Sequence, residues 1–219
     1  MKTVHTLFGR NILAIILLLT IFSCKNEKEK EATINQNVNN VIETQTYSID
    51  TSGVAIQWVA YKFTERAGVK GVFKDFKLSS KEEAKSVEDL LQNSNVIINT
   101  NSINSGEKIR DDKLRTYFFK VFHTDTISGS ILSASNGKGS LALKMNGIQN
   151  EMDYNYSFNK DTLALTAVLD LKKWKGEEAI KTLNKECYEL HTGPDGVSKL
   201  WPDVSIEIKL PIQKALFNR

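Results

Sequence analysis

The chain has 219 residues, of which 41% are hydrophobic and 25% are charged, and its 29 Lys and Arg against 26 Asp and Glu give a formal net charge of +3. Three Pro, 12 Gly and two Cys residues exclude a collagen-like, proline-rich or disulfide-framework protein. The proportions are typical of one globular domain with room for a further terminal segment, and the nearly balanced charge predicts no nucleic-acid partner.

The first 23 residues carry the pattern of an export signal. Lys2 and Arg10 precede an apolar run over residues 12–22, as in the charged and apolar regions of a signal peptide. The run is shorter than the roughly 20 residues that a membrane-spanning helix needs. It ends at Ser23-Cys24, which resembles a bacterial lipoprotein signal, whose cysteine is acylated and becomes the mature N-terminus. The alternative is an ordinary secretory signal that leaves Cys24 as a free thiol.

Removal of residues 1–23 leaves 219 − 23 = 196 residues with a net charge of 27 − 26 = +1. With Cys24 acylated, Cys187 has no disulfide partner and is most simply a small core residue. We expect residues 24–46, the lipidated cysteine followed by a charged run and an Asn/Gln/Thr-rich stretch, to form a flexible tether. The predicted location is the bacterial cell envelope, at the outer membrane, through this lipid anchor.

From residue 47 on, apolar and polar residues alternate in short segments separated by turn residues. This period of two is typical of half-buried antiparallel strands. The clearest case is the hairpin around Asn146-Gly147, a dipeptide that favours a tight turn. Eight strands are predicted, near residues 47–62, 69–78, 95–104, 125–134, 139–147, 150–158, 162–171 and 203–211.

Three short helices are expected between these strands. Ser80 and Glu83 form a capping box for a helix over residues 81–92, and residues 110–119 and 176–187 are the other candidates. The sequence therefore predicts an all-β domain with a few short helices. Eight antiparallel strands with one apolar face favour closure into a barrel, while a two-layer β-sandwich stays open as the alternative.

Five segments resemble the YceI-like family in their order and approximate spacing. They are Tyr47–Asp50 with Val54–Trp58, Val69–Phe76, Val96–Val121, Gly139–Leu143 with Gly147-Ile148, and Trp201 with Asp203–Ile206. The resemblance implies that residues 47–219 form an eight-stranded antiparallel lipocalin-like β-barrel of a kind associated with polyisoprenoid binding. The chain departs from the family's pattern at Ser52-Gly53, at His123-Thr124, and in a longer connection between Trp174 and Trp201.

A long apolar ligand needs a tunnel with few polar groups, because its affinity comes from removing hydrocarbon from water. The residues expected to line that tunnel are Trp58, Phe73, Ile98, Arg110, Leu114, Phe118, Phe119, Phe122, Leu143, Met145, Met152, Tyr154, Tyr156 and Phe158. Arg110 is included as a contact for a ligand head group, although Arg110 and Asp111 could also close a helix end or pair across the barrel mouth. The alternative for each apolar member of the set is that it only fills the core.

The sequence offers little for catalysis. After signal removal His123 and His191 remain, the first expected among phenylalanines in the core and the second at the surface. No HExxH motif, paired cysteines or phosphate-binding glycines are present, and no G-x-S-x-G elbow places a serine nucleophile. We therefore predict a protein that is not an enzyme and holds no cofactor or metal.

Two functions are carried forward. The leading hypothesis is a lipid-anchored carrier or scavenger that binds an isoprenoid-like or other long-chain amphiphile in a barrel cavity. The alternative is a filled barrel whose surface loops, above all residues 175–202, bind an envelope partner. A homodimer is compatible with either function, and the sequence does not decide the oligomeric state.

Overall fold

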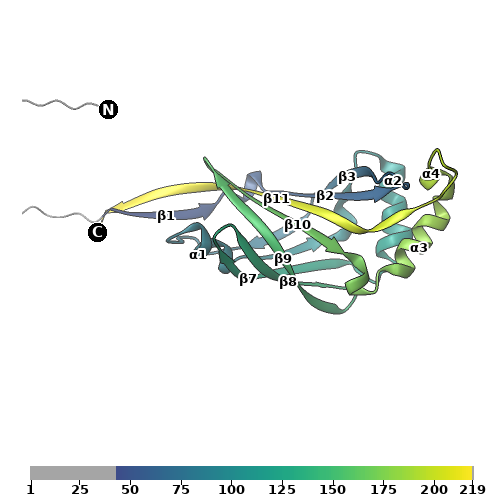
Figure 1. Ribbon diagram of the computed structural model, residues 1–219. Helices are drawn as coiled ribbons and strands as arrows, with labels where there is room; N and C mark the ends of the chain where they lie inside the picture. The colour runs from purple at the N-terminus through teal and green to yellow at the C-terminus, as the bar shows by residue number, and fades with distance from the viewer. Residues whose placement is uncertain (1–42, 219) are drawn as a thin grey trace, which may run out of the picture. The chain divides into compact units, whose positions relative to one another are not determined.

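The structure, a computed structural model, describes residues 43–218 (Figure 1). The predicted signal peptide, Cys24 and the tether up to residue 42 lie outside the described residues. The prediction is wrong for residues 43–46, because they lie in a strand and pair with residues 215–218. The strands are β1 (Glu43–Ile49), β2 (Ala55–Lys62), β3 (Ala67–Phe73), β4 (Phe76–Ser79), β5 (Asn95–Asn99), β6 (Ile103–Asn104), β7 (Thr126–Ser135), β8 (Lys138–Met145), β9 (Ile148–Asn159), β10 (Thr162–Asp170) and β11 (Leu200–Asn218). The helices are α1 (Val87–Gln92), α2 (Lys108–Lys113), α3 (Glu177–Glu186) and α4 (Tyr188–His191), with 3-10 turns η1 (Thr51–Gly53), η2 (Thr100–Ser102) and η4 (Leu171–Trp174) and a π-helix η3 (Leu114–Phe119).

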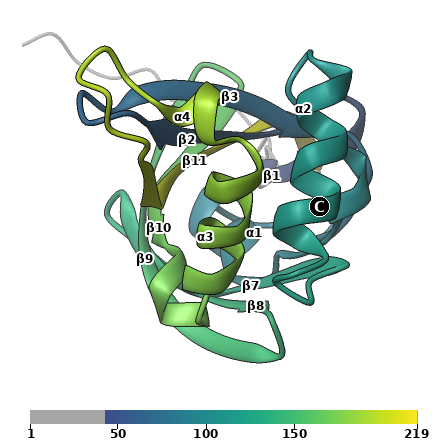
Figure 2. The same ribbon diagram turned by 90° about the vertical axis from the view of Figure 1, so that its right-hand side faces the viewer.

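These strands form one antiparallel sheet in the order β4-β5-β7-β8-β9-β10-β11-β2-β3-β6, and β1 pairs with β11 off this path. The chain itself joins the two ends of the order, because β3 leads into β4 and β5 leads through η2 into β6. Two backbone hydrogen bonds cross this junction, from Lys74 N to Ser102 O and from Asn99 N to Asp75 O. The sheet thus curls round to meet itself, and Figure 2 shows α2, α3 and α4 in front of one end. The predicted all-β barrel-type fold with few short helices is confirmed.

The predicted count of eight strands is wrong, since the described residues contain 11. Predicted strand 47–62 is split because the side chain of Asp50 accepts a hydrogen bond from Ser52 N and starts η1. Predicted strand 95–104 is split where Thr100 Oγ1 donates to the carbonyl of Thr124, at 2.7 Å. Such side-chain bonds to the backbone compete with the ladder of a strand, and alternation of residue types does not reveal them.

The first helix also differs from the prediction. Helix α1 begins at Val87, with Ser86 as the N-cap that accepts from Asp89 N, at 3.1 Å. The capping box at Ser80 and Glu83 is therefore wrong, because Ala84 instead forms a β-bridge with Tyr47 through two backbone hydrogen bonds of 2.8 and 2.9 Å. The other two predictions are confirmed: residues 110–119 lie in α2 and η3, and residues 176–187 contain α3.

Strands β9 and β10 pair along only part of their length. Their register ends at Thr166↔Asn155, whereas β9 pairs with β8 from Ile148 and β10 pairs with β11 as far as Asp170. Beyond Thr166 the two strands diverge (Figure 1). Turn η4 closes the open side, because Asn150 Nδ2 donates to the carbonyl of Lys173, at 2.6 Å.

Two aromatic side chains lie across glycines on the inner face of the sheet. Tyr154 of β9 is opposite Gly139 of β8, and Trp58 of β2 is opposite Gly71 of β3. A Cβ atom at Gly139 would lie 2.5 Å from the ring of Tyr154, and one at Gly71 would lie 2.7 Å from both Cε2 of Trp58 and the carbonyl oxygen of Asn104. Only glycine leaves room for these rings, so each ring can cross a neighbouring strand.

We expect Gly139→Ala to lower the free energy of unfolding by about 1–3 kcal/mol, the usual cost of overpacking a filled site. The added methyl group meets backbone and a ring held by its own hydrogen bond, so neither can move aside cheaply. Urea unfolding measures the change. The control is Gly129→Ala, whose Cβ first meets a methyl group of Val96, at 3.2 Å, and no backbone atom. Equal losses for the two variants would contradict the close approach at Gly139.

Candidate functional site: two apolar cavities inside the barrel

Two apolar cavities lie inside the curled sheet. One, of about 130 Å³, reaches Leu78 of β4 and Leu91 of α1, and we call it the α1-end cavity. The other, of about 120 Å³, reaches Leu114 of η3 and Leu183 of α3, and we call it the α3-end cavity. Helices α1 and α3 lie at opposite ends of the sheet (Figure 1), so the two cavities follow one another along its interior.

A layer of side chains stands where the two cavities meet. Five residues line both of them and are called the junction residues: Phe73, Ile127, Met145, Leu169 and Ile206. Met145 is buried, and an unbranched Met side chain adapts readily to the space around it. The same side chains therefore form the common boundary of the two cavities.

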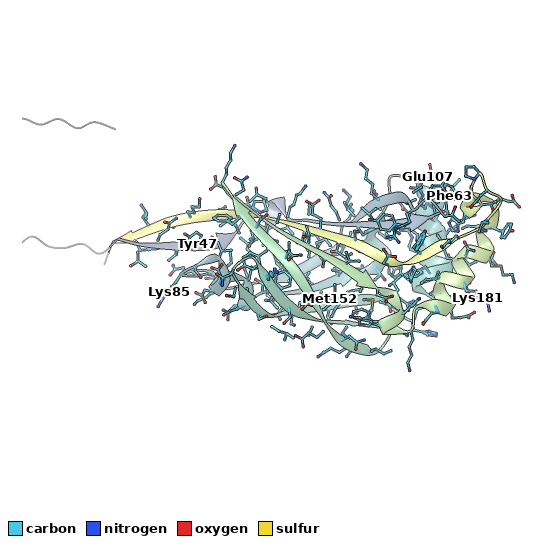
Figure 3. All side chains as sticks on the ribbon, viewed as in Figure 1. Tyr47, Phe63, Lys85, Glu107, Met152 and Lys181 are labelled. Atoms are coloured by element: carbon cyan, nitrogen blue, oxygen red, sulfur yellow. The ribbon has the colours of Figure 1, made fainter. Side chains whose placement is uncertain are left out.

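Most of the predicted lining lies at these cavities. The α1-end cavity is lined by Ile98, Leu143, Met152 and Tyr154, the α3-end cavity by Trp58, Leu114, Phe118, Phe119 and Phe122, and both by Phe73 and Met145. Figure 3 draws these side chains on the ribbon and labels Met152 of β9. That they contact a ligand stays a prediction, but the structure brings all of these residues together around one interior.

Three predicted residues line neither cavity. Arg110 is exposed on α2, and its neighbour Asp111 is instead the buried group, which accepts from Ser105 N and Ser105 Oγ at 2.8 and 2.6 Å. Tyr156 is buried and donates to Glu88 Oε1, at 2.8 Å. Phe158 packs edge-on against Tyr47, with ring centroids 6.3 Å apart. Both aromatic residues belong to the core near α1, where they fill space.

Tyr154 brings a polar group to the wall of the α1-end cavity. Its hydroxyl donates to the carbonyl of Ser133, at 2.9 Å. Burial, together with the neighbouring Tyr156, raises the pKa of Tyr154 to about 12. The phenol is therefore neutral at physiological pH and its one proton is already engaged, so this wall presents an apolar surface to the cavity.

Several residues that line the cavities are not among those predicted from the sequence. Ile180 and Leu183 of α3 reach the α3-end cavity, and their spacing of three residues on an amphipathic helix is the signal that would have indicated it. Leu169 lies in the predicted strand 162–171 and lines both cavities, although it is not among the predicted lining residues. The π-helix η3 has no sequence signal, although such helices are rare and frequently occur at functional sites.

Both expectations for the histidines are wrong. His123 is exposed and has a positive φ of 48°. His191 is half-buried, its Nδ1 lies 3.1 Å from Asn184 Oδ1, and burial, with smaller effects of Lys62 and Lys113, lowers its pKa to about 4. Within residues 43–218 no group of three or more His, Cys, Asp or Glu residues could hold a metal ion.

The outer side of the sheet carries a groove of about 950 Å³ where β9 and β10 diverge. Its lining includes the acidic residues Glu151, Asp153 and Glu207. Tyr154 and Ala167 line both this groove and the α1-end cavity. A single layer of side chains therefore separates the interior from the outside at this position. Among the described helices, none is long and apolar enough to cross a membrane.

Comparison with known proteins agrees with this architecture. The YceI-like domain matches residues 47–212. The fold is similar to that of a polyisoprenoid binding domain from Saccharophagus degradans implicated in plant cell wall breakdown (TM-score 0.55, 14% identity, 77% of this chain and 98% of that one). It is also similar to the crystal structure of Burkholderia cenocepacia BcnA (TM-score 0.51, 13% identity, 76% and 99%). No curated protein sequence matches the chain. Since the domain match covers most of the sequence, the chain belongs to the YceI-like domain family.

Proposed function

We propose that this domain binds a long-chain isoprenoid-like or other apolar amphiphile inside its barrel. The observation that carries the proposal is the succession of two apolar cavities, which share the junction residues and extend from α1 to α3. An extended hydrocarbon chain matches a narrow apolar interior of this kind, because its binding energy comes from apolar surface removed from water. The similarity to a polyisoprenoid binding domain from Saccharophagus degradans supports the same class of ligand.

Binding of a long chain requires the junction layer to open. Ligand pockets usually measure about 300–1,000 Å³, and the two cavities together do not reach that range. Met145 can adopt other rotamers at low cost, since its side chain is unbranched. The ligand therefore takes the place of side-chain positions that close the tunnel in the free protein.

The remaining parts of the proposal concern location and role. Acylation of Cys24 anchors the domain to a bacterial membrane, in our proposal the outer membrane, and the tether of residues 25–42 holds it near that surface. A lipid-binding barrel in this place acts as a carrier, scavenger or store of an amphiphile, and no catalytic step is required.

A second function is favoured by apolar side chains on the surface of the segment 175–202. Tyr188, Leu190 and Val197 are 53%, 58% and 46% exposed, within or just after α4. Exposed apolar residues gathered in one segment are typical of protein interaction sites. In this second proposal the barrel is a filled scaffold, and this segment binds a partner in the cell envelope.

The tunnel is tested by Ile127→Phe. The larger ring fills the junction between the cavities, so we expect binding of geranylgeraniol, measured by native mass spectrometry, to weaken at least about tenfold, whereas the fold is retained because the site borders free space. The matched control is Ile97→Phe on the neighbouring strand β5, where the side chain is 51% exposed on the outer face. Unchanged binding by the Ile127 variant would contradict a ligand that passes through the junction.

The anchor is tested by Cys24→Ser in a bacterial host. Loss of the thiol removes the acylation site, so the variant should leave the detergent phase and appear in the aqueous phase of a Triton X-114 partition. The same partition with Cys187→Ser, which changes the buried cysteine of the domain, should stay in the detergent phase. A Cys24 variant that still enters the detergent phase would show that the anchor is not acylation of this residue.

The second function is tested by site-specific photo-cross-linking in intact cells. A photoreactive residue at position 190 should give one discrete cross-linked species, because this side chain is exposed within the apolar segment. The same residue at position 132 on β7, where Leu132 is 52% exposed, should give none. Equal labelling from both positions, or none from position 190, would count against a partner bound by this segment.

A further inference from the structure

The chain has three tryptophans, and two of them donate the indole N–H to a backbone carbonyl. Trp174 Nε1 donates to Leu143 O at 3.0 Å, and Trp201 Nε1 donates to Phe63 O at 2.7 Å. Trp58 is 6% exposed, and its Nε1 is buried without a hydrogen-bond partner among the described residues. A buried donor without a partner is costly, so this exception needs an explanation in the function of the site.

Trp58 belongs to the wall of the α3-end cavity. Its indole lines the α3-end cavity and lies across Gly71 of β3, with Cε2, the carbon bonded to Nε1, on the side of the glycine. Tyr154 lies across Gly139 in the same way at the other cavity, yet its hydroxyl reaches the carbonyl of Ser133. In both sites an aromatic ring lies across a glycine of the neighbouring strand. They differ in that Trp58 Nε1 has no hydrogen-bond partner among the described residues.

The other side chains of the α3-end cavity offer no partner and little support for water. Apart from Trp58, its lining includes two side chains with N–H or O–H groups, Tyr61 and Trp201. The hydroxyl of Tyr61 lies 2.8 Å from Ser205 Oγ, and the N–H of Trp201 is bonded to Phe63 O. A buried water usually makes about three hydrogen bonds, and Trp58 can supply only one. An oxygen attached to an apolar chain needs only that one bond.

We propose that Trp58 is the polar contact for the ligand, and that the ligand therefore carries an acceptor oxygen, as in a ketone, ester or ether, which takes the indole N–H in the α3-end cavity. The inference rests on the proposed function and deepens it, since it separates oxygen-bearing amphiphiles from plain hydrocarbons. An oxygen without its own hydrogen suits the site best, because the apolar lining leaves a hydroxyl proton of the ligand without an acceptor.

The test compares two probes of equal chain length, methyl tridecyl ketone and pentadecane, on the purified protein. Binding of each is measured by native mass spectrometry for the natural chain, for Trp58→Phe, and for a variant with benzothienylalanine at position 58. The benzothienyl ring keeps the size of indole and lacks the N–H, so it separates loss of the donor from loss of volume. The control is Trp174→Phe, since Trp174 lines neither cavity and its N–H bonds to Leu143 O.

We expect both Trp58 replacements to weaken binding of the ketone about five- to tenfold relative to any change in the binding of pentadecane. This is the effect of one lost hydrogen bond. Trp174→Phe should change the binding of the two probes equally. If both probes bind and the Trp58 replacements weaken the binding of both to the same extent, the inference is overturned and the proposed function stands. If neither probe binds the natural chain, the proposed function fails, and the inference fails with it.

Discussion

The whole arrangement depends on strand β11, which satisfies the hydrogen-bonding groups of three other strands. One edge pairs with β10 over Asp203–Pro211, and the other pairs first with β2 over Leu200–Lys209 and then with β1 from Ile212 onward. A strand has two edges and buried backbone groups must be paired, so a change of partner is possible only where the ladder is interrupted. Pro211 stands at that change, and Pro202 lies within the register shift near the start of the strand. Prolines tolerate these positions because a ladder N–H is not needed there.

The class of this fold could be predicted from the sequence because burial of apolar side chains, the main stabilising effect, leaves a pattern in the order of residues. Period-two alternation records which face of each strand is buried, and the strands at 139–147, 150–158 and 162–171 appear in the structure as β8, β9 and β10. The interruptions could not be predicted in the same way. They arise from single polar contacts, such as that of Thr100 with the carbonyl of Thr124. The residues in these contacts are either far apart in sequence or of types that are common in many turns.

The lining of the cavities could also be predicted only in part. Aromatic and Met residues on inward positions of strands, such as Phe73 and Met145, were assigned to the interior, and both line the cavities. Arg110 was chosen by charge and position alone, and the structure places it at the surface, because a short helix can bury Asp111 instead. Whether an inward aromatic residue fills the core, as Tyr156 does, or borders a void is decided by the packing of several strands at once, which no local pattern contains.

The two cavities lower the stability of the fold, and this loss is relevant to function. Residual cavities in protein cores destabilise by about 24 cal/mol per Å³, so each of the two cavities corresponds to about 3 kcal/mol of stability that tighter packing would supply. Larger side chains at positions such as Ile127 or Leu169 would close them without a change of fold. A chain that keeps two adjoining apolar voids, with an unpartnered donor at the wall of one of them, gives up stability that, in our proposal, a bound amphiphile restores. In that proposal, the groups that make the free barrel less stable are the same groups that make the occupied barrel selective.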